Sequence, residues 1–169
     1  AIQYFPLVEP VHFAYAPGGT YDFDRNGIIS AAGNKTRWYY YVQKANTQIK
    51  AIDHVLMNSA NIGMIVHGKK ANLLADTQAD NRAELIRDGK FRQLTSVSGD
   101  DCFVGCFDYN GGTALYVVNY SRKDKANVTL NFDKTYGYEV IQRAVSAEVA
   151  AKNLPLTLEA GEGALVVLK

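Results

Sequence analysis

Apolar side chains recur at gaps of three and four residues between Thr36 and Asn58. They are Trp38, Tyr41, Val42, Ala45, Ile49, Ile52 and Leu56. Because an α-helix has 3.6 residues per turn, these positions form one stripe along a long amphipathic helix. We expect the stripe to be buried, either against the strands that follow it or against another copy of the chain. A domain outside this chain is the remaining way to cover it.

After residue 60, short runs of alternating apolar and polar residues dominate the chain. They cover residues 62–66, 102–109, 114–121, 128–132, 138–142, 154–158 and 164–168. The second and third runs flank Asn110-Gly111, which supplies the positive φ angles of a tight hairpin turn. Regular short strands separated by turn residues are typical of an antiparallel sandwich. The pattern therefore predicts a mainly β fold, an antiparallel β-sandwich preceded by one long amphipathic helix.

The first part of the chain differs from the rest in its pattern of apolar and polar residues. Residues 2–8 form an apolar run that ends at Glu9-Pro10, which is typical of a buried strand. An aromatic, glycine-containing loop separates this run from the helix. We therefore divide the chain into residues 1–60, holding the strand, loop and helix, and residues 61–169, holding the sandwich.

Charge and cysteine usage narrow the function classes. The chain has 18 basic and 17 acidic residues, and it shows no basic stripe of the kind that nucleic-acid binders carry. No run approaches the roughly 20 apolar residues of a membrane span. Cys102 and Cys106 are about 13 Å apart in a strand that rises roughly 3.3 Å per residue, too far for a disulfide. We expect two core thiols rather than a zinc pair, since His12, His54 and His67 are scattered.

Three segments, in this order, resemble the end of the β-galactosidase-like glycoside hydrolases, whose catalytic domain is a (β/α)8 barrel. Residues 2–10 resemble the eighth barrel strand. Residues 33–41, with Asn46 and Ile49, resemble the final barrel helix. Residues 156–168 look like the closing hairpin of the small β-sandwich behind such barrels. Val8 departs from the family, because an aromatic residue that helps to floor the sugar site is expected there.

The resemblance implies a non-catalytic accessory module of a secreted or cell-surface glycoside hydrolase. The two carboxylates that hydrolyse glycosides in that family would lie upstream of Ala1. The chain is thus not expected to be an enzyme by itself, and Glu9 alone cannot replace the missing pair. The implied partners are the neighbouring catalytic domain of the same parent chain and a polysaccharide or oligosaccharide, with neither nucleic acid nor membrane.

Aromatic residues in the predicted hairpin are the candidate carbohydrate-binding residues. Phe103, Phe107 and Tyr109 share one side of its first strand, and Tyr116 and Tyr120 share one side of its second. Coplanar exposed rings stack on sugar C–H groups, and we expect Tyr109 and Tyr116 to lie on opposite faces of the hairpin. The alternative is that the rings fill the core and the sandwich braces a catalytic barrel without binding sugar. A lectin-like or cohesin-type interaction domain is a third interpretation.

One loop resembles the first half of a calcium-binding loop. Asp22, Asp24 and Asn26 stand at its first, third and fifth positions, followed by Gly27. The twelfth position, where a bidentate Glu closes the coordination shell, is Gly33. We therefore expect no cofactor and an acidic turn before the helix, with calcium as the alternative.

Overall fold

The computed structural model describes residues 28–29, 33–69 and 84–169. The strand expected at residues 2–8 and the candidate calcium ligands Asp22, Asp24 and Asn26 lie outside the described residues. Contacts divide the chain into two units, Ala1–Ile49 and Lys50–Lys169. The division falls inside the predicted helix.

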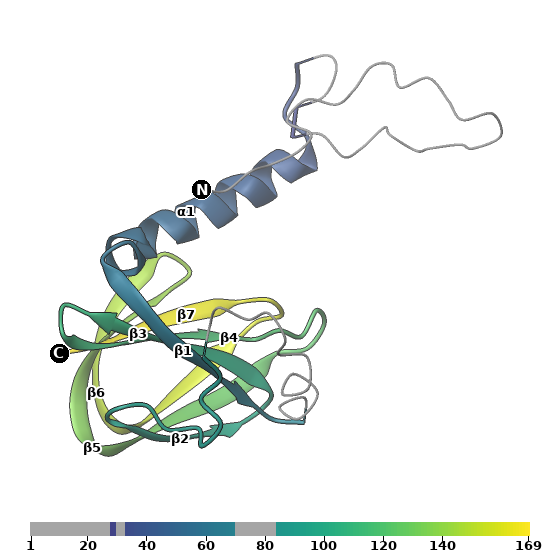
Figure 1. Cartoon of the computed structure of the whole chain (residues 1–169). Coiled ribbons are helices and arrows are strands. Elements are labelled where there is room, and N and C mark those ends of the chain that lie inside the picture. Colours follow the sequence, from purple (N-terminus) through teal and green to yellow (C-terminus); the bar gives the residue numbers. More distant parts are fainter. Residues whose placement is uncertain (1–27, 30–32, 70–83) are drawn as a thin grey trace. The chain divides into compact units, whose positions relative to one another are not determined.

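The predicted helix is present as α1, Arg37–Leu56 (Figure 1). Its C-terminal end is capped by side chains, since Asn58 Nδ2 donates to the His54 carbonyl and Ser59 Oγ donates to the Val55 carbonyl, both at 2.7 Å. These bonds satisfy carbonyls that the last turn of a helix leaves without helical partners. The helix therefore ends where Asn58 and Ser59 can reach back to it.

Seven strands follow the helix. They are β1 Ser59–His67, β2 Leu94–Gly99, β3 Cys102–Tyr109, β4 Gly112–Val118, β5 Ala126–Gln142, β6 Val145–Leu158 and β7 Gly163–Leu168. Every paired strand is antiparallel, in the order β1-β3-β4-β7-β5-β2 with β6 beside β5 (Figure 1). The mainly β, antiparallel fold with one preceding helix is confirmed.

Strand β5 curls the sheet into a sandwich-like shape. Its first half pairs with β2 and its second half with β7, while β6 follows it along most of its length. The β5–β6 register shifts between Asn131 and Tyr136, so the strand bends there instead of ending. Two short strands predicted at residues 128–132 and 138–142 are thus one long strand.

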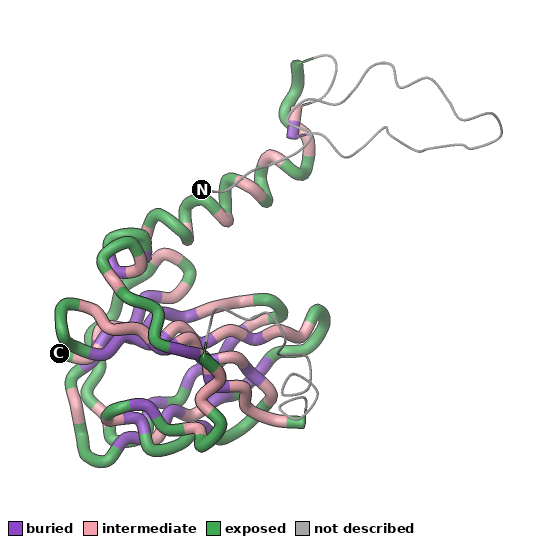
Figure 2. The backbone as a smooth tube through the Cα atoms, viewed as in Figure 1, coloured by how far each residue is buried: buried purple, intermediate pink, exposed green. Residues whose placement is uncertain are grey.

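The main core lies inside the curled sheet, and Figure 2 shows its buried positions along the strands. Cys102, Val104 and Cys106 alternate inward from β3 and are fully buried. Both cysteines are free, and burial raises the pKa of each thiol to about 12. The prediction of two core thiols is confirmed.

A second apolar cluster covers the outer face of the sheet within Lys50–Lys169. Ile52 and Val55, from the last two turns of α1, pack with Ala114 of β4 and with Leu165 and Val167 of β7. Only this end of the predicted stripe is buried, because Ile52 is 8% exposed whereas Ile49 is 37% and Tyr41 is 61% exposed. Burial of the stripe against the strands is therefore shown only for this end, while its cover by another copy or by a domain outside this chain stays a prediction. Val55, outside the stripe, is the most buried residue of the helix.

Candidate functional site

The five candidate rings lie on one face of the β3–β4 hairpin. Directly opposed residues of an antiparallel pair share a face, and Gly105 is opposite Tyr116. Gly105 alternates with Cys106 and so faces the same way as Phe103, Phe107 and Tyr109. Tyr120, just beyond β4, stacks on Phe103 with ring centroids 4.4 Å apart. The expectation that Tyr109 and Tyr116 lie on opposite faces is wrong, because the register brings them to the same one.

We call these five residues the aromatic face. Its covered end is formed by three half-buried rings, Phe107, Tyr109 and Tyr116, which pack against the cluster containing Ile52 and Val55.

At the covered end, rings occupy the space that glycines leave. A Cβ added at Gly163 would lie 2.4 Å from the Tyr116 Oη and 2.6 Å from its Cζ. A Cβ added at Gly105 would lie 2.9 Å from the Phe107 Cε2. Burial also raises the pKa of Tyr116. Tyr116 and Phe107 are therefore held close to the sheet, and with Tyr109 they pack against the cluster that contains Ile52 and Val55.

The pocket end of the aromatic face, Phe103 and Tyr120, has a different environment. Tyr120 Oη donates to Asp101 Oδ2 at 3.0 Å, and the Lys69 N–H donates to Asp101 Oδ1 at 3.0 Å. The Lys69 N–H and the Tyr120 hydroxyl hold the pKa of Asp101 below its ordinary value. Burial and the neighbouring Asp101 raise the pKa of Tyr120 to about 12. At neutral pH the pair is thus an ionised carboxylate and a neutral phenol.

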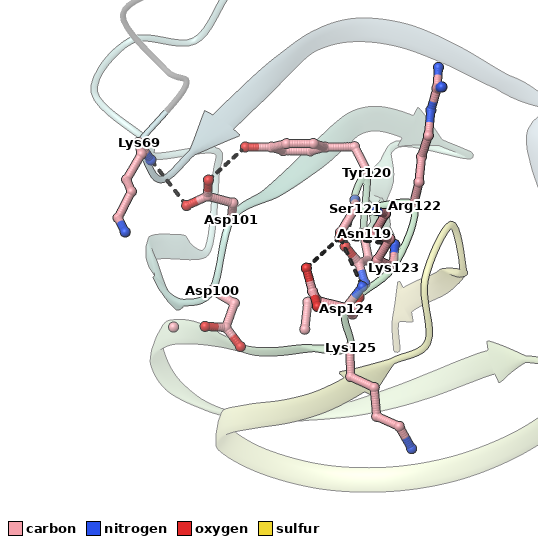
Figure 3. Close-up of a pocket in the computed structure, with 12 residues that line it drawn as sticks. Lys69, Asp100, Asp101, Asn119, Tyr120, Ser121, Arg122, Lys123, Asp124 and Lys125 are labelled. Atoms are coloured by element: carbon pink, nitrogen blue, oxygen red, sulfur yellow. Dashed lines mark hydrogen bonds between the residues drawn. The ribbon is translucent and has the colours of Figure 1, made fainter.

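Tyr120 and Asp101 line an open pocket of about 820 Å³, which we call the Tyr120 pocket (Figure 3). Its walls come from the residues after β1, the β2–β3 turn and the β4–β5 connection. The carboxylates that line it are Asp100, Asp101 and Asp124. The cations that line it are Lys69, Arg122, Lys123 and Lys125. A pocket with both signs interspersed can donate and accept hydrogen bonds.

The β4–β5 connection that forms one wall is held in shape by Asn119. This residue is 1% exposed, and its Nδ2 donates to the carbonyls of Asp124 at 2.8 Å and Glu159 at 2.9 Å. Its Oδ1 accepts from the Ser121 N–H at 2.9 Å. Ser121 Oγ in turn accepts from the Asp124 N–H at 3.0 Å. The wall is therefore organised by the chain itself before any ligand binds.

Hydrogen bonds also fix the opposite wall. Asp100 Oδ2 accepts from the Asn127 N–H at 2.8 Å, and the Asp100 N–H donates to the Asn127 carbonyl at 2.9 Å. In the β4–β5 connection, on the first wall, Lys125 forms a 2.8 Å ion pair with Glu159. Across residues 28–29, 33–69 and 84–169, no group of three or more His, Cys, Asp or Glu residues could hold a metal ion.

Most of the residues that shape this pocket are absent from the candidates predicted from the sequence. Asp100, Asp101, Asn119 and Arg122 were not among them, and Tyr120 was included only as a stacking ring. A signal existed in Asn119, Ser121 and Asp124, since such polar residues between two strands favour a side-chain-stabilised loop. Loops of this kind carry binding residues more often than strands do.

Comparison with known proteins found no matching family model, curated protein or solved structure. In the part of the chain that the structure describes, no helix is long and apolar enough to cross a membrane. The function is therefore argued from the geometry of the sandwich and from the resemblance carried by the sequence.

Proposed function

We propose that this chain is a non-catalytic accessory module of a secreted or cell-surface glycoside hydrolase, whose sandwich braces the catalytic domain of the same parent chain. The proposal rests on the packing of Ile52 and Val55, near the end of α1, on the sheet, which we call the seat of α1. Ile52 and Val55 are buried in one cluster with Ala114, Leu165 and Val167, and three rings of the aromatic face pack against that cluster.

The brace role is argued from the difference between the first and the last turns of α1. Its first three turns carry the residues that resemble a final barrel helix, while its last two turns pack on the sandwich. Tyr41 and Ile49 expose apolar surface on the preceding turns, which suits contact with the remainder of a barrel.

The test uses the full-length parent enzyme with Val55→Ala. Val55 is 1% exposed, so its truncation should loosen the seat of α1 and lower the temperature of irreversible inactivation by about 3 °C or more. Activity at 25 °C should be unchanged, because the proposed catalytic carboxylates lie elsewhere. The control is Lys44→Ala, an exposed position on the same helix. An unchanged inactivation temperature in Val55→Ala would refute the brace.

The proposal also expects the isolated chain to have no glycosidase activity. Two-carboxylate hydrolysis needs both members of the pair at a defined separation. Purified chain incubated with nitrophenyl glycosides should release no nitrophenol above the rate in buffer. Turnover that copurifies with the chain and is abolished by Glu9→Ala would contradict the non-catalytic assignment.

Carbohydrate binding is the second candidate function, and the Tyr120 pocket is the observation that favours it. The pocket is lined by one aromatic ring, by carboxylates and by cations, and one of its loops is held in shape by the side-chain amide of Asn119. Sugars are bound by this combination of apolar and hydrogen-bonding groups. Of the five candidate rings, that of Tyr120 lines the pocket.

A further inference from the structure

We infer that the Tyr120 pocket binds the end of a neutral oligosaccharide chain, and that the aromatic face is not a surface for long polysaccharides. The inference rests on the carbohydrate-binding role given above as the second candidate function, and it is independent of the brace. It assigns a ligand size, a ligand charge and a set of contact residues to one place on the sandwich.

The positions of the five rings of the aromatic face argue against a long, flat polysaccharide as the ligand. A polysaccharide surface needs several exposed coplanar rings in a row. Phe107, Tyr109 and Tyr116 pack instead against the cluster that contains Ile52 and Val55, and Phe103 stacks on Tyr120 at an interplanar angle of 29°. One ring, that of Tyr120, lines the pocket. A single ring within a pocket of about 820 Å³ suits a compact ligand, since small-molecule sites range over roughly 300–1,000 Å³.

The charges of the pocket favour a ligand that is neutral and rich in hydroxyl groups. Four cations and three carboxylates line it, so its net charge is +1 before the ion pair between Lys125 and Glu159 is counted. A ligand carboxylate or phosphate would meet carboxylates as well as cations. A hydroxyl group instead donates to a carboxylate and accepts from a cation, and both bonds are charge-assisted.

Two carboxylates already have fixed positions from which to accept such hydroxyls. Asp101 is held by Lys69 and Tyr120, and Asp100 is held by Asn127. An ionised carboxylate can accept about four hydrogen bonds, so these contacts leave capacity for a ligand. Together with the loop ordered by Asn119, they reduce the entropy lost on binding.

The experiment is isothermal titration of the purified chain with cellobiose, lactose and xylobiose, beside affinity electrophoresis in the corresponding soluble polysaccharides. The test variants are Arg122→Ala, at an exposed loop position, and Asp101→Asn, which keeps the shape of the side chain. The matched controls are Lys152→Ala, an exposed cation outside the pocket, and Tyr109→Phe at the covered end. Far-ultraviolet circular dichroism checks that each variant is folded.

At least one disaccharide should bind the parent chain, and both test variants should weaken that binding by about tenfold or more, equivalent to about 1.4 kcal/mol. Both controls should bind within about twofold of the parent. Binding that Tyr109→Phe weakens and Arg122→Ala leaves intact would overturn the pocket while keeping carbohydrate binding. Absence of binding to every saccharide would overturn both, and would leave the brace to its own test.

Discussion

The covered end and the pocket end of the aromatic face have the same kind of residue on the same side of the same hairpin, yet they differ in what surrounds them. Phe107, Tyr109 and Tyr116 at the covered end pack beside Ile52 and Val55 of α1. At the pocket end, Tyr120 stacks on Phe103 and bonds to Asp101. Alternation along a strand therefore identifies the face that a ring occupies, whereas residues distant in the sequence decide what the ring contacts there.

Glycines contribute to this difference in two ways. At the covered end, Gly105 and Gly163 leave room for rings to approach the sheet. At the pocket end, Gly99 has a positive φ of 102° and lets the β2–β3 turn approach β5. The covered end thus depends on side-chain packing, and the pocket end depends on backbone geometry. The predictions below separate these two kinds of dependence.

The largest expected effect is that of Gly99→Ala at the pocket end. A Cβ there would lie 2.1 Å from the Asn127 carbonyl oxygen and would also strain a positive φ. We expect a loss of about 3–5 kcal/mol in the free energy of unfolding, measured by urea denaturation. Gly111→Ala is the matched control, because its φ is +77° but nothing lies within 4 Å, and it should lose about 1 kcal/mol. Equal losses in the two variants would refute the close-approach explanation.

A smaller effect is expected at the covered end from Ile52→Ala. Ile52 is 8% exposed and packs on the sheet, so its truncation should lower the free energy of unfolding by about 2–4 kcal/mol. Ile49→Ala, one turn earlier and 37% exposed, should cost about 1 kcal/mol or less. Chemical denaturation of both variants under the same conditions measures the difference. A larger loss for Ile49→Ala would mean that the seat of α1 is elsewhere.

The smallest effect is a pH dependence at the pocket end. The folded-state pKa of Tyr120 is about 12, above the ordinary value of 10. A group whose pKa is raised by folding stabilises the folded state fully below its unfolded pKa, and this contribution is lost as pH rises from 10 towards 12. In Tyr120→Phe the loss of stability over that window should be shallower, by about 1 kcal/mol or less because Tyr120 is partly exposed. If the free energy of unfolding falls equally with pH in the parent chain and in Tyr120→Phe, the raised pKa of Tyr120 is contradicted.

Much of the fold could be predicted because its signals are local. The period of 3.6 defined α1, and Asn110-Gly111 between two alternating runs defined the β3–β4 hairpin. Strand β2 was missed because its buried residues, Leu94 and Val97, are three apart rather than two. The register shift between Leu94 and Ser96 accounts for that spacing. A bulge thus conceals a strand from a test for period-two alternation.

The site was harder to predict than the fold, because its contacts are long-range. Asp101 meets Tyr120 across 19 residues of sequence and Lys69 across 32 residues. Asn119 reaches Glu159 across 40 residues. The hydrophobic period within one helix or strand cannot reveal contacts between residues so far apart in the sequence. The rings themselves were visible in the sequence, but the cluster against which three of them pack joins residues of α1, β4, β5 and β7.

The most direct test of the account is amide hydrogen exchange along α1 in the isolated chain. If Ile52 and Val55 seat the helix on the sheet, the amides of residues 52–56 should exchange slowly, with protection close to that of β3 and β4. Those of residues 41–49 should exchange faster by about tenfold or more, since their side chains are largely exposed. Exchange at residues 52–56 as fast as at residues 41–49 would contradict the packing of the end of α1 on the sheet.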